Sequence, residues 1–81
     1  MLEQEFTVNS LVGTDTKNTT MFIQKAVSFQ SNIWFVFEDK TVNAKSLLGM
    51  LSINLKPGCK ITLFADGIDE KEAISELIKL L

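Results

Sequence analysis

Residues 33–43, IWFVFEDKTVN, decide the fold class of this chain. The first five of them are aromatic or β-branched, a composition that predicts a strand. Glu38 and Asp39 follow as a short turn, and residues 40–43 return as the second arm of a hairpin. The fold therefore contains at least one antiparallel pair of strands.

The residues before this hairpin predict one strand and one helix. Apolar and polar residues alternate loosely over residues 2–8, which predicts a strand buried on one face. Residues 9–13 are expected to form a loop. Over residues 16–29 apolar residues recur at spacings of three and four, as on a helix that packs on one side. Asp15 or Thr14 is placed to cap the first turn of that helix.

The residues after the hairpin predict helix, strand and helix. Ser46 is well placed as the N-cap of a short helix that reaches residue 53. Residues 57–58, Pro-Gly, mark a turn, and residues 59–65 alternate as a strand with one apolar side. Residues 69–81 form the last helix, where Asp69 and Glu72 have the spacing of a capping box. The expected apolar stripe of that helix is Ala73, Ile74, Leu77, Ile78 and Leu81.

The predicted order is β-α-β-β-α-β-α in a single domain over residues 1–81. Helices gathered on one face of a four-stranded antiparallel sheet make an α+β open-faced sandwich. The composition agrees with a globular chain, because 46% of the 81 residues are hydrophobic and 22% are charged. The net charge of −2 argues against a nucleic-acid partner, and the apolar runs are too short to span a membrane.

Three residue types are missing: the chain has no His, no Arg and no Tyr. Acid–base or nucleophilic chemistry by imidazole is therefore excluded, as is a zinc site built from the usual ligands. We expect no enzyme activity and no cofactor. The single cysteine, Cys59, cannot form an internal disulfide, and no charged-then-apolar leader opens the chain. A whole small protein of the cytosol is the expectation.

Residues 41–52, TVNAKSLLGMLS, carry an Asn-x-Lys-Ser segment followed by two apolar residues, Gly, two apolar residues and Ser. This pattern resembles the regulatory region of HPr, the phosphocarrier family of the bacterial sugar phosphotransferase system. The resemblance covers essentially the whole chain and implies the HPr-like open-faced β-sandwich. In Gram-positive members the matching serine, here Ser46, is phosphorylated by HPr kinase/phosphorylase.

The phosphoryl-accepting motif of that family, Gly-x-His-Ala-Arg-Pro-Ala, falls on residues 13–19, GTDTKNT. Asp15 stands at the histidine position and Lys17 at the arginine position, so histidine phosphotransfer is excluded. The chain thus resembles the Crh-like members, which lack the histidine and keep the serine. Asp15 has three interpretations: an N-cap, which we favour, a partial imitation of phosphohistidine, or an acyl-phosphate acceptor. The last lacks the metal-binding carboxylate cluster that such chemistry generally uses.

The segment around Ser46 predicts a regulatory site. As a cap alone, Ser46 contributes about 1 kcal/mol, whereas a phosphate would add about −1.5 to −2 charges at the positive end of the helix. Met50 and Ile53 are expected to face the core, with Leu47 as a further candidate. Leu48 and Leu51, at i and i+3, share an outer face. The resemblance implies a docking patch for enzymes and the regulator CcpA, with these partner-binding residues: Lys17, Lys45, Leu47, Leu48 and Leu51. Lys45 has a second interpretation, a local pairing.

Trp34, Val36 and Phe64 are predicted to point away from the helices, on the face of the sheet that is normally polar. Two interpretations remain open: ordinary cross-strand packing under long side-chain stems, or a homodimer or partner surface. The sequence therefore predicts an HPr-like regulatory protein of carbon catabolite control, without enzyme activity, that is switched by phosphorylation of Ser46. The alternative is a binding module without that switch, which acts through Trp34, Val36 and Phe64.

Overall fold

The computed structural model describes residues 1–9, 15–52 and 55–81. Its elements follow the predicted order β-α-β-β-α-β-α. In chain order they are β1 (Leu2–Thr7), α1 (Thr16–Val27), β2 (Asn32–Phe37), β3 (Lys40–Asn43), α2 (Leu47–Ser52), β4 (Lys60–Asp66) and α3 (Glu70–Ile78).

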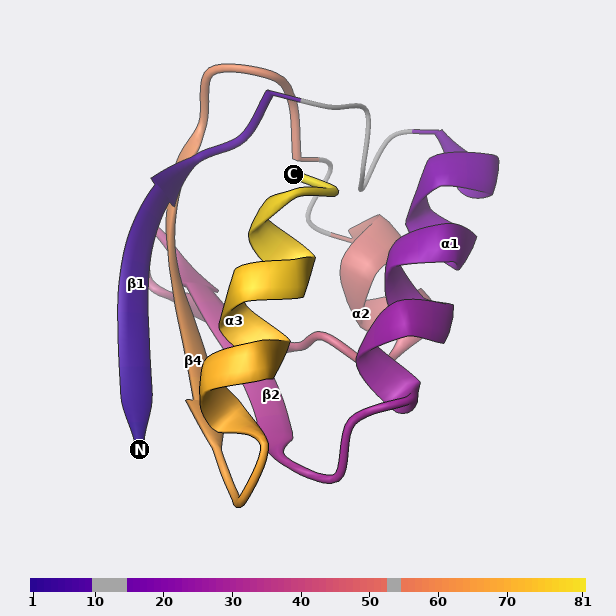
Figure 1. The fold of residues 1–81 in the computed structure, drawn as a ribbon. Helices are drawn as coiled ribbons and strands as arrows, with labels where there is room; N and C mark the ends of the chain where they lie inside the picture. Colours follow the sequence, from indigo (N-terminus) through magenta and orange to yellow (C-terminus); the bar gives the residue numbers. More distant parts are fainter. Residues whose placement is uncertain (10–14, 53–54) are drawn as a thin grey trace.

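The four strands form one sheet in the order β1-β4-β2-β3, and every neighbouring pair is antiparallel. All three helices lie on one side of this sheet, and α3 crosses in front of β4 and β2 (Figure 1). The predicted open-faced architecture is confirmed. Strand pairing, which periodicity does not provide, makes β1 and β3 the edges of the sheet.

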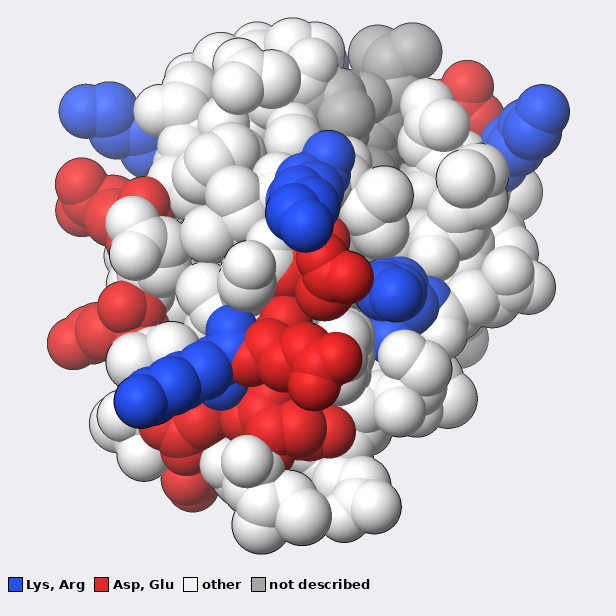
Figure 2. Space-filling model, viewed as in Figure 1, with Lys and Arg blue, Asp and Glu red and all other residues white. Residues whose placement is uncertain are grey.

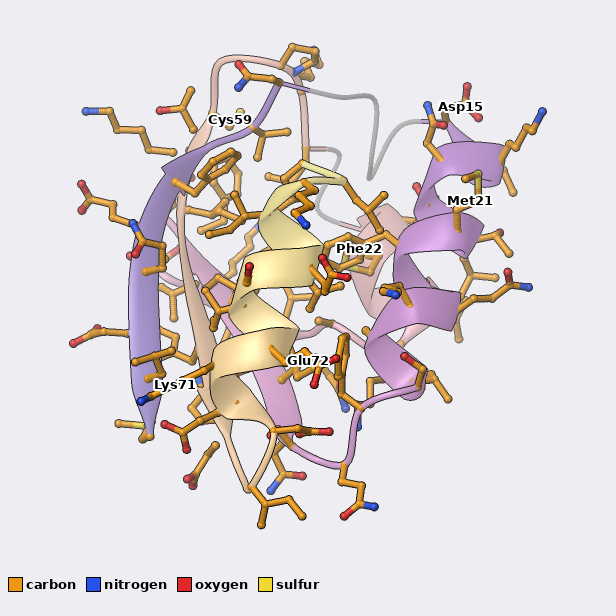
Figure 3. All side chains as sticks on the ribbon, viewed as in Figure 1. Asp15, Met21, Phe22, Cys59, Lys71 and Glu72 are labelled. Carbon is orange, nitrogen blue, oxygen red and sulfur yellow. The ribbon has the colours of Figure 1, made fainter. Side chains whose placement is uncertain are left out.

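The core lies between the sheet and the helices. On β4 the alternation is as predicted: Ile61 and Leu63 are buried, whereas the Phe64 side chain lies on the opposite face. Phe22 points from α1 into the interior, while its neighbour Met21 is exposed (Figure 3). Other fully buried apolar side chains are Val8, Phe35, Met50, Leu55 and Leu77.

Two helices end earlier than predicted. α1 stops at Val27, and Phe29 lies buried in the turn that follows. α3 stops at Ile78, after which the backbone N–H groups of Leu80 and Leu81 bond to carbonyls three residues earlier. These tighter final turns satisfy carbonyls that the helix itself leaves unpaired, while the apolar stripe continues past the helix to the buried Leu81.

The predicted capping box of α3 is wrong. Asp69 stands at the N-cap position, but its side chain makes no capping hydrogen bond. Its carboxylate instead accepts the backbone N–H of Gln30 at 2.8 Å and that of Ser31 at 2.9 Å, and also the Ser31 hydroxyl. Asp69 therefore fixes the turn between α1 and β2, 38 residues away in the sequence, to the start of α3.

These hydrogen bonds favour the ionised carboxylate. The Ser31 hydroxyl, followed by the Gln30 N–H, holds the pKa of Asp69 below its usual value. The pKa of Glu70 is lowered chiefly by the backbone N–H of Gly67, which donates to its carboxylate at 3.2 Å. Both carboxyl groups therefore bind a proton less readily in the folded protein than in the unfolded chain.

We predict that acid destabilises the fold through these groups. A carboxyl whose pKa is lower in the folded state adds stability above its unfolded pKa and loses it as the pH falls through the folded pKa. The melting temperature should therefore fall progressively below about pH 5. Thermal unfolding of Asp69→Asn should show a flatter pH profile, whereas the control Glu72→Gln should follow the parent. Equal acid sensitivity in Asp69→Asn and the parent would contradict the assignment.

Candidate functional site

Ser46 begins α2 as the sequence predicts. Its hydroxyl accepts the backbone N–H of Gly49 at 3.1 Å, and its carbonyl accepts that of Met50 at 3.0 Å. The first bond satisfies an N–H group that the helix leaves unpaired. Ser46 is only partly buried, and its side chain lies at the start of the helix.

Gly49 gives the Ser46 hydroxyl its space against the helix. A Cβ added at Gly49 would lie 3.3 Å from Cγ1 of Val42 and 3.4 Å from the Ser46 oxygen. The first separation is tighter than ordinary van der Waals contact, and the second lies at its lower limit. The glycine thus lets α2 pack closely on β3 while Ser46 retains its capping position.

Lys45 is paired locally, which is one of the two interpretations that the sequence leaves open. Its ammonium donates to the backbone carbonyl of Phe29 at 2.9 Å, and its backbone N–H donates to the side-chain oxygen of Asn43 at 2.9 Å. The residue before Ser46 is thereby tied to the turn that follows α1.

An exposed apolar surface covers the outside of α2; its members are Leu47, Leu48 and Leu51, and we call it the α2 surface. Leu48 is 84% exposed and Leu47 is 42% exposed, while Leu51 is partly buried. The prediction that Leu47 is a further core residue is wrong, because Met50 fills the buried position of this short helix. Ile53, also predicted to face the core, lies outside the described residues.

Asp15 is the N-cap of α1. Its carboxylate accepts the backbone N–H of Lys17 at 2.8 Å and that of Asn18 at 3.4 Å. The favoured interpretation is thus confirmed, whereas the alternative cap Thr14 lies outside the described residues. Over residues 1–9, 15–52 and 55–81, no group of three or more His, Cys, Asp or Glu could hold a metal ion, so the acyl-phosphate interpretation gains no support.

Lys17 and Lys45 do not lie at one site. Lys17 is on the first turn of α1, two residues after Asp15 (Asp15 is labelled in Figure 3), whereas the ammonium of Lys45 reaches Phe29, beyond the last turn. A helix of 12 residues separates these ends by about 18 Å. Lys17 and Lys45, both predicted to bind a partner, therefore lie near opposite ends of α1.

Trp34 and Phe64 meet on the open face of the sheet. They are paired across β2 and β4, and their rings stack with centroids 5.3 Å apart and planes within 3° of parallel. Val36 lies two residues further along β2, and all three side chains are half-buried. Because β2 and β4 are neighbours in the sheet, the three side chains lie close together on this face.

Acidic side chains gather over α3 on the opposite face of the molecule, where Lys side chains lie beside them (Figure 2). The Glu76 carboxylate receives Lys79 at 2.8 Å and Lys25 at 4.0 Å. Its hydrogen bond with Lys79 lowers the pKa of Glu76. The charge of Glu76 is thus compensated by Lys79 and Lys25.

No described helix has the length and apolar character needed to cross a membrane.

A family model described as the PTS HPr component phosphorylation site matches residues 2–81. The chain belongs to the HPr family. Within it the chain is Crh-like: it is 35% identical to the HPr-like protein Crh of Bacillus subtilis (strain 168) over 77 residues, which are 95% of this chain and 91% of that protein.

Solved structures of HPr-family proteins agree with this assignment. The crystal structure of HPr-C-His from Thermoanaerobacter tengcongensis is similar with a TM-score of 0.91 and 36% identity, covering 99% of this chain and 90% of that one. Crh of B. subtilis, in a crystal structure described as a dimer with a swapped domain, is similar with a TM-score of 0.78 and 34% identity, covering 99% and 92%. Both the fold and the ancestry that the sequence predicts are confirmed.

Sequence reasoning missed the contacts that hold the Ser46 segment in place. The bond from Lys45 to Phe29 spans 16 residues and ends on a backbone carbonyl, which has no signature in the sequence. The contact between Asp69 and Ser31 also has no signature in the sequence, because only the tertiary fold brings the two residues together. By contrast, the serine, its glycine three residues later and the apolar residues between them were visible as a motif.

Proposed function

We propose that this HPr-family chain is a regulatory protein of carbon catabolite control, switched by phosphorylation of Ser46. The observation that carries the proposal is the position of Ser46, a partly exposed residue at the start of α2 and directly before the exposed Leu47 and Leu48. The match of the whole chain to Crh and HPr supports it. Asp15 and Lys17 stand where the family's phosphocarrier histidine and arginine lie, so the route from enzyme I to a sugar permease is closed.

The proposed modification is a phosphoryl transfer from ATP by an HPr kinase/phosphorylase. The Ser46 oxygen bonds to the γ-phosphorus, the bond from that phosphorus to the bridging oxygen of ADP breaks, and the hydroxyl proton leaves to the kinase. The product adds about −1.5 to −2 charges at the N-terminus of α2, where the helix dipole favours negative charge. The fold is retained, and the change is one of surface charge.

The α2 surface then provides the docking contact. An apolar side chain as exposed as Leu48 adds nothing to the core, whereas it can bury its whole surface in a partner's pocket. A CcpA-type transcription regulator is the partner we propose, reading the phosphate and Leu48 together. Lys45 is engaged at the Phe29 carbonyl, so its proposed role is to hold the segment beside Ser46 rather than to reach the partner.

Intact-mass spectrometry after incubation with an HPr kinase/phosphorylase and ATP tests the switch. We expect one phosphate on the parent protein and none on Ser46→Ala. Ser52→Ala is the matched control, because Ser52 is an exposed serine on the same helix whose hydroxyl donates to the Gly49 carbonyl. Loss of the Ser46 cap costs only about 1 kcal/mol, so the variant remains folded.

Two results would contradict the proposal. One is an unmodified parent under conditions that phosphorylate a genuine HPr. The other is a phosphate that persists on Ser46→Ala but not on Ser52→Ala, which would move the site to the end of α2.

A further inference from the structure

The open face of the sheet has an ordered arrangement of side chains. Strand register places one outward residue of each strand in a row that runs across the whole sheet, with a second row beside it. In the order β1, β4, β2, β3, the first row is Glu3, Phe64, Trp34, Asn43, and the second is Glu5, Thr62, Val36, Thr41.

The aromatic pair lies in the middle of this arrangement. Phe64 and Trp34 belong to the two central strands, and their stacked rings stand at the midpoint of the first row. Cross-strand stacking explains why the two rings contact each other. It leaves part of each ring in water on a face that is normally polar, and these parts remain available to a partner.

The two edges of the face differ in charge. On β1, Glu3 and Glu5 are both exposed. On the β3 side, a hollow of about 440 Å³ lies beside Trp34 and is lined by Asn32, Ile33, Trp34, Thr41, Asn43 and Lys45. The Lys45 ammonium has three N–H donors, of which the Phe29 carbonyl receives one. One edge thus presents carboxylates, and the other presents amide and ammonium donors in a recess.

We infer that this face binds a second copy of the chain, sheet against sheet, about a two-fold axis that runs parallel to the strands between β4 and β2. That axis reverses each row, because a two-fold interface brings the same patch of both copies together. Phe64 of one copy then lies on Trp34 of the second. Glu3 of one copy then lies over Asn43 of the second copy and over the hollow that Lys45 lines. Because of the two-fold symmetry, this contact between the acidic edge and the hydrogen-bond donors occurs twice. An axis perpendicular to the strands would place Glu3 and Glu5 on their own copies, and like charges oppose it.

The size of the face sets the expected strength. Four strands spaced about 4.8 Å apart, with four to seven residues each, make a patch at the small end of specific interfaces. The dimer should therefore be weak and reversible. It uses none of the α2 surface; of the residues that it does use, Lys45 adjoins Ser46.

Sedimentation equilibrium and tryptophan emission test the dimer together, from about 10 µM to about 1 mM protein, the range in which a small interface dissociates. Trp34 is the only tryptophan, so its emission reports directly on this face. We expect a concentration-dependent dimer and a blue shift of the emission that follows the same binding curve.

Two variants keep Trp34 as the fluorescent reporter and are expected to disrupt the contact between the two copies. Phe64→Lys should be monomeric at all of these concentrations. Glu3→Lys should weaken association about tenfold or more, because the carboxylate acts twice in a two-fold interface. The control Glu72→Lys makes the same charge change on α3, away from the sheet, and should associate like the parent. Circular dichroism verifies that each variant is folded. If Phe64→Lys is unfolded, Glu3→Lys still tests the interface.

Three results would overturn the inference. The first is a parent that is monomeric throughout. The second is a dimer that forms without any change in Trp34 emission. The third is a dimer that Phe64→Lys and Glu3→Lys leave intact, as an exchange of elements between two copies would be.

Discussion

Replacing Gly67 by Ala is expected to lower the melting temperature by roughly 10–20 °C, which corresponds to about 2–3 kcal/mol in a domain of this size. A Cβ at Gly67 would lie 2.6 Å from Cα and 2.6 Å from Oγ of Ser31. Neither atom can move away cheaply, because Ser31 is fully buried and both its N–H and its hydroxyl are bound by Asp69. The substitution therefore forces the turn before α3 away from the turn after α1.

Gly58→Ala is the matched control. Gly58 has a φ of +98°, yet a Cβ there would meet no atom within 4 Å. The cost is then only that of the backbone conformation, about 1 kcal/mol, or roughly 4–8 °C. Thermal unfolding of the two variants separates steric overlap from conformational preference. Equal melting temperatures would show that the contact between Gly67 and Ser31 is not what the substitution disturbs.

Replacing Leu48 by Asp should weaken binding of the phosphorylated protein to a CcpA-type regulator about 10–100-fold, because a charge is then buried in an apolar contact. Since Leu48 is 84% exposed, the free energy of unfolding should change by less than about 0.5 kcal/mol. Calorimetric titration of the regulator measures the first effect, and thermal unfolding measures the second.

Ile68→Asp is the control for this experiment. Ile68 is 89% exposed and lies in the turn between β4 and α3, away from α2. The Ile68→Asp variant should bind the regulator as tightly as the parent protein does. If Ile68→Asp loses as much affinity as Leu48→Asp, or if Leu48→Asp loses none, the α2 surface is not the docking contact.

Structural features that depend only on residues nearby in the sequence could be predicted. The alternation of Ile61, Leu63 and Ala65 depends only on the period of a strand, and the Asp15 and Ser46 caps depend on residues within the next turn. Sidedness of β2 and β4 could also be predicted, which placed Trp34 and Phe64 on the open face before their pairing was known.

Residues with distant partners could not be predicted in this way. Asp69 and Glu72 have the spacing of a capping box, but the carboxylate of Asp69 finds three donors on Gln30 and Ser31 that outcompete a single helix N–H. Leu47 looks like a core residue beside Met50, yet a six-residue helix has room for few buried positions. The site itself required the family resemblance, because a serine before two apolar residues and a glycine is a helix cap in most proteins.

The order of the strands also affects how this chain is made. Of the four strands of this sheet, β1 leaves the ribosome first; it is an edge strand whose hydrogen-bonding neighbour is β4, so Leu2 must wait for Ala65. At about 5–20 residues per second, that partner is synthesised several seconds later. Until then, Phe6 and the rest of β1 have no sheet to join. Completion of the sheet is thus a late event in biosynthesis, and a nascent chain stalled before residue 60 should hold its N-terminal segment open to proteases.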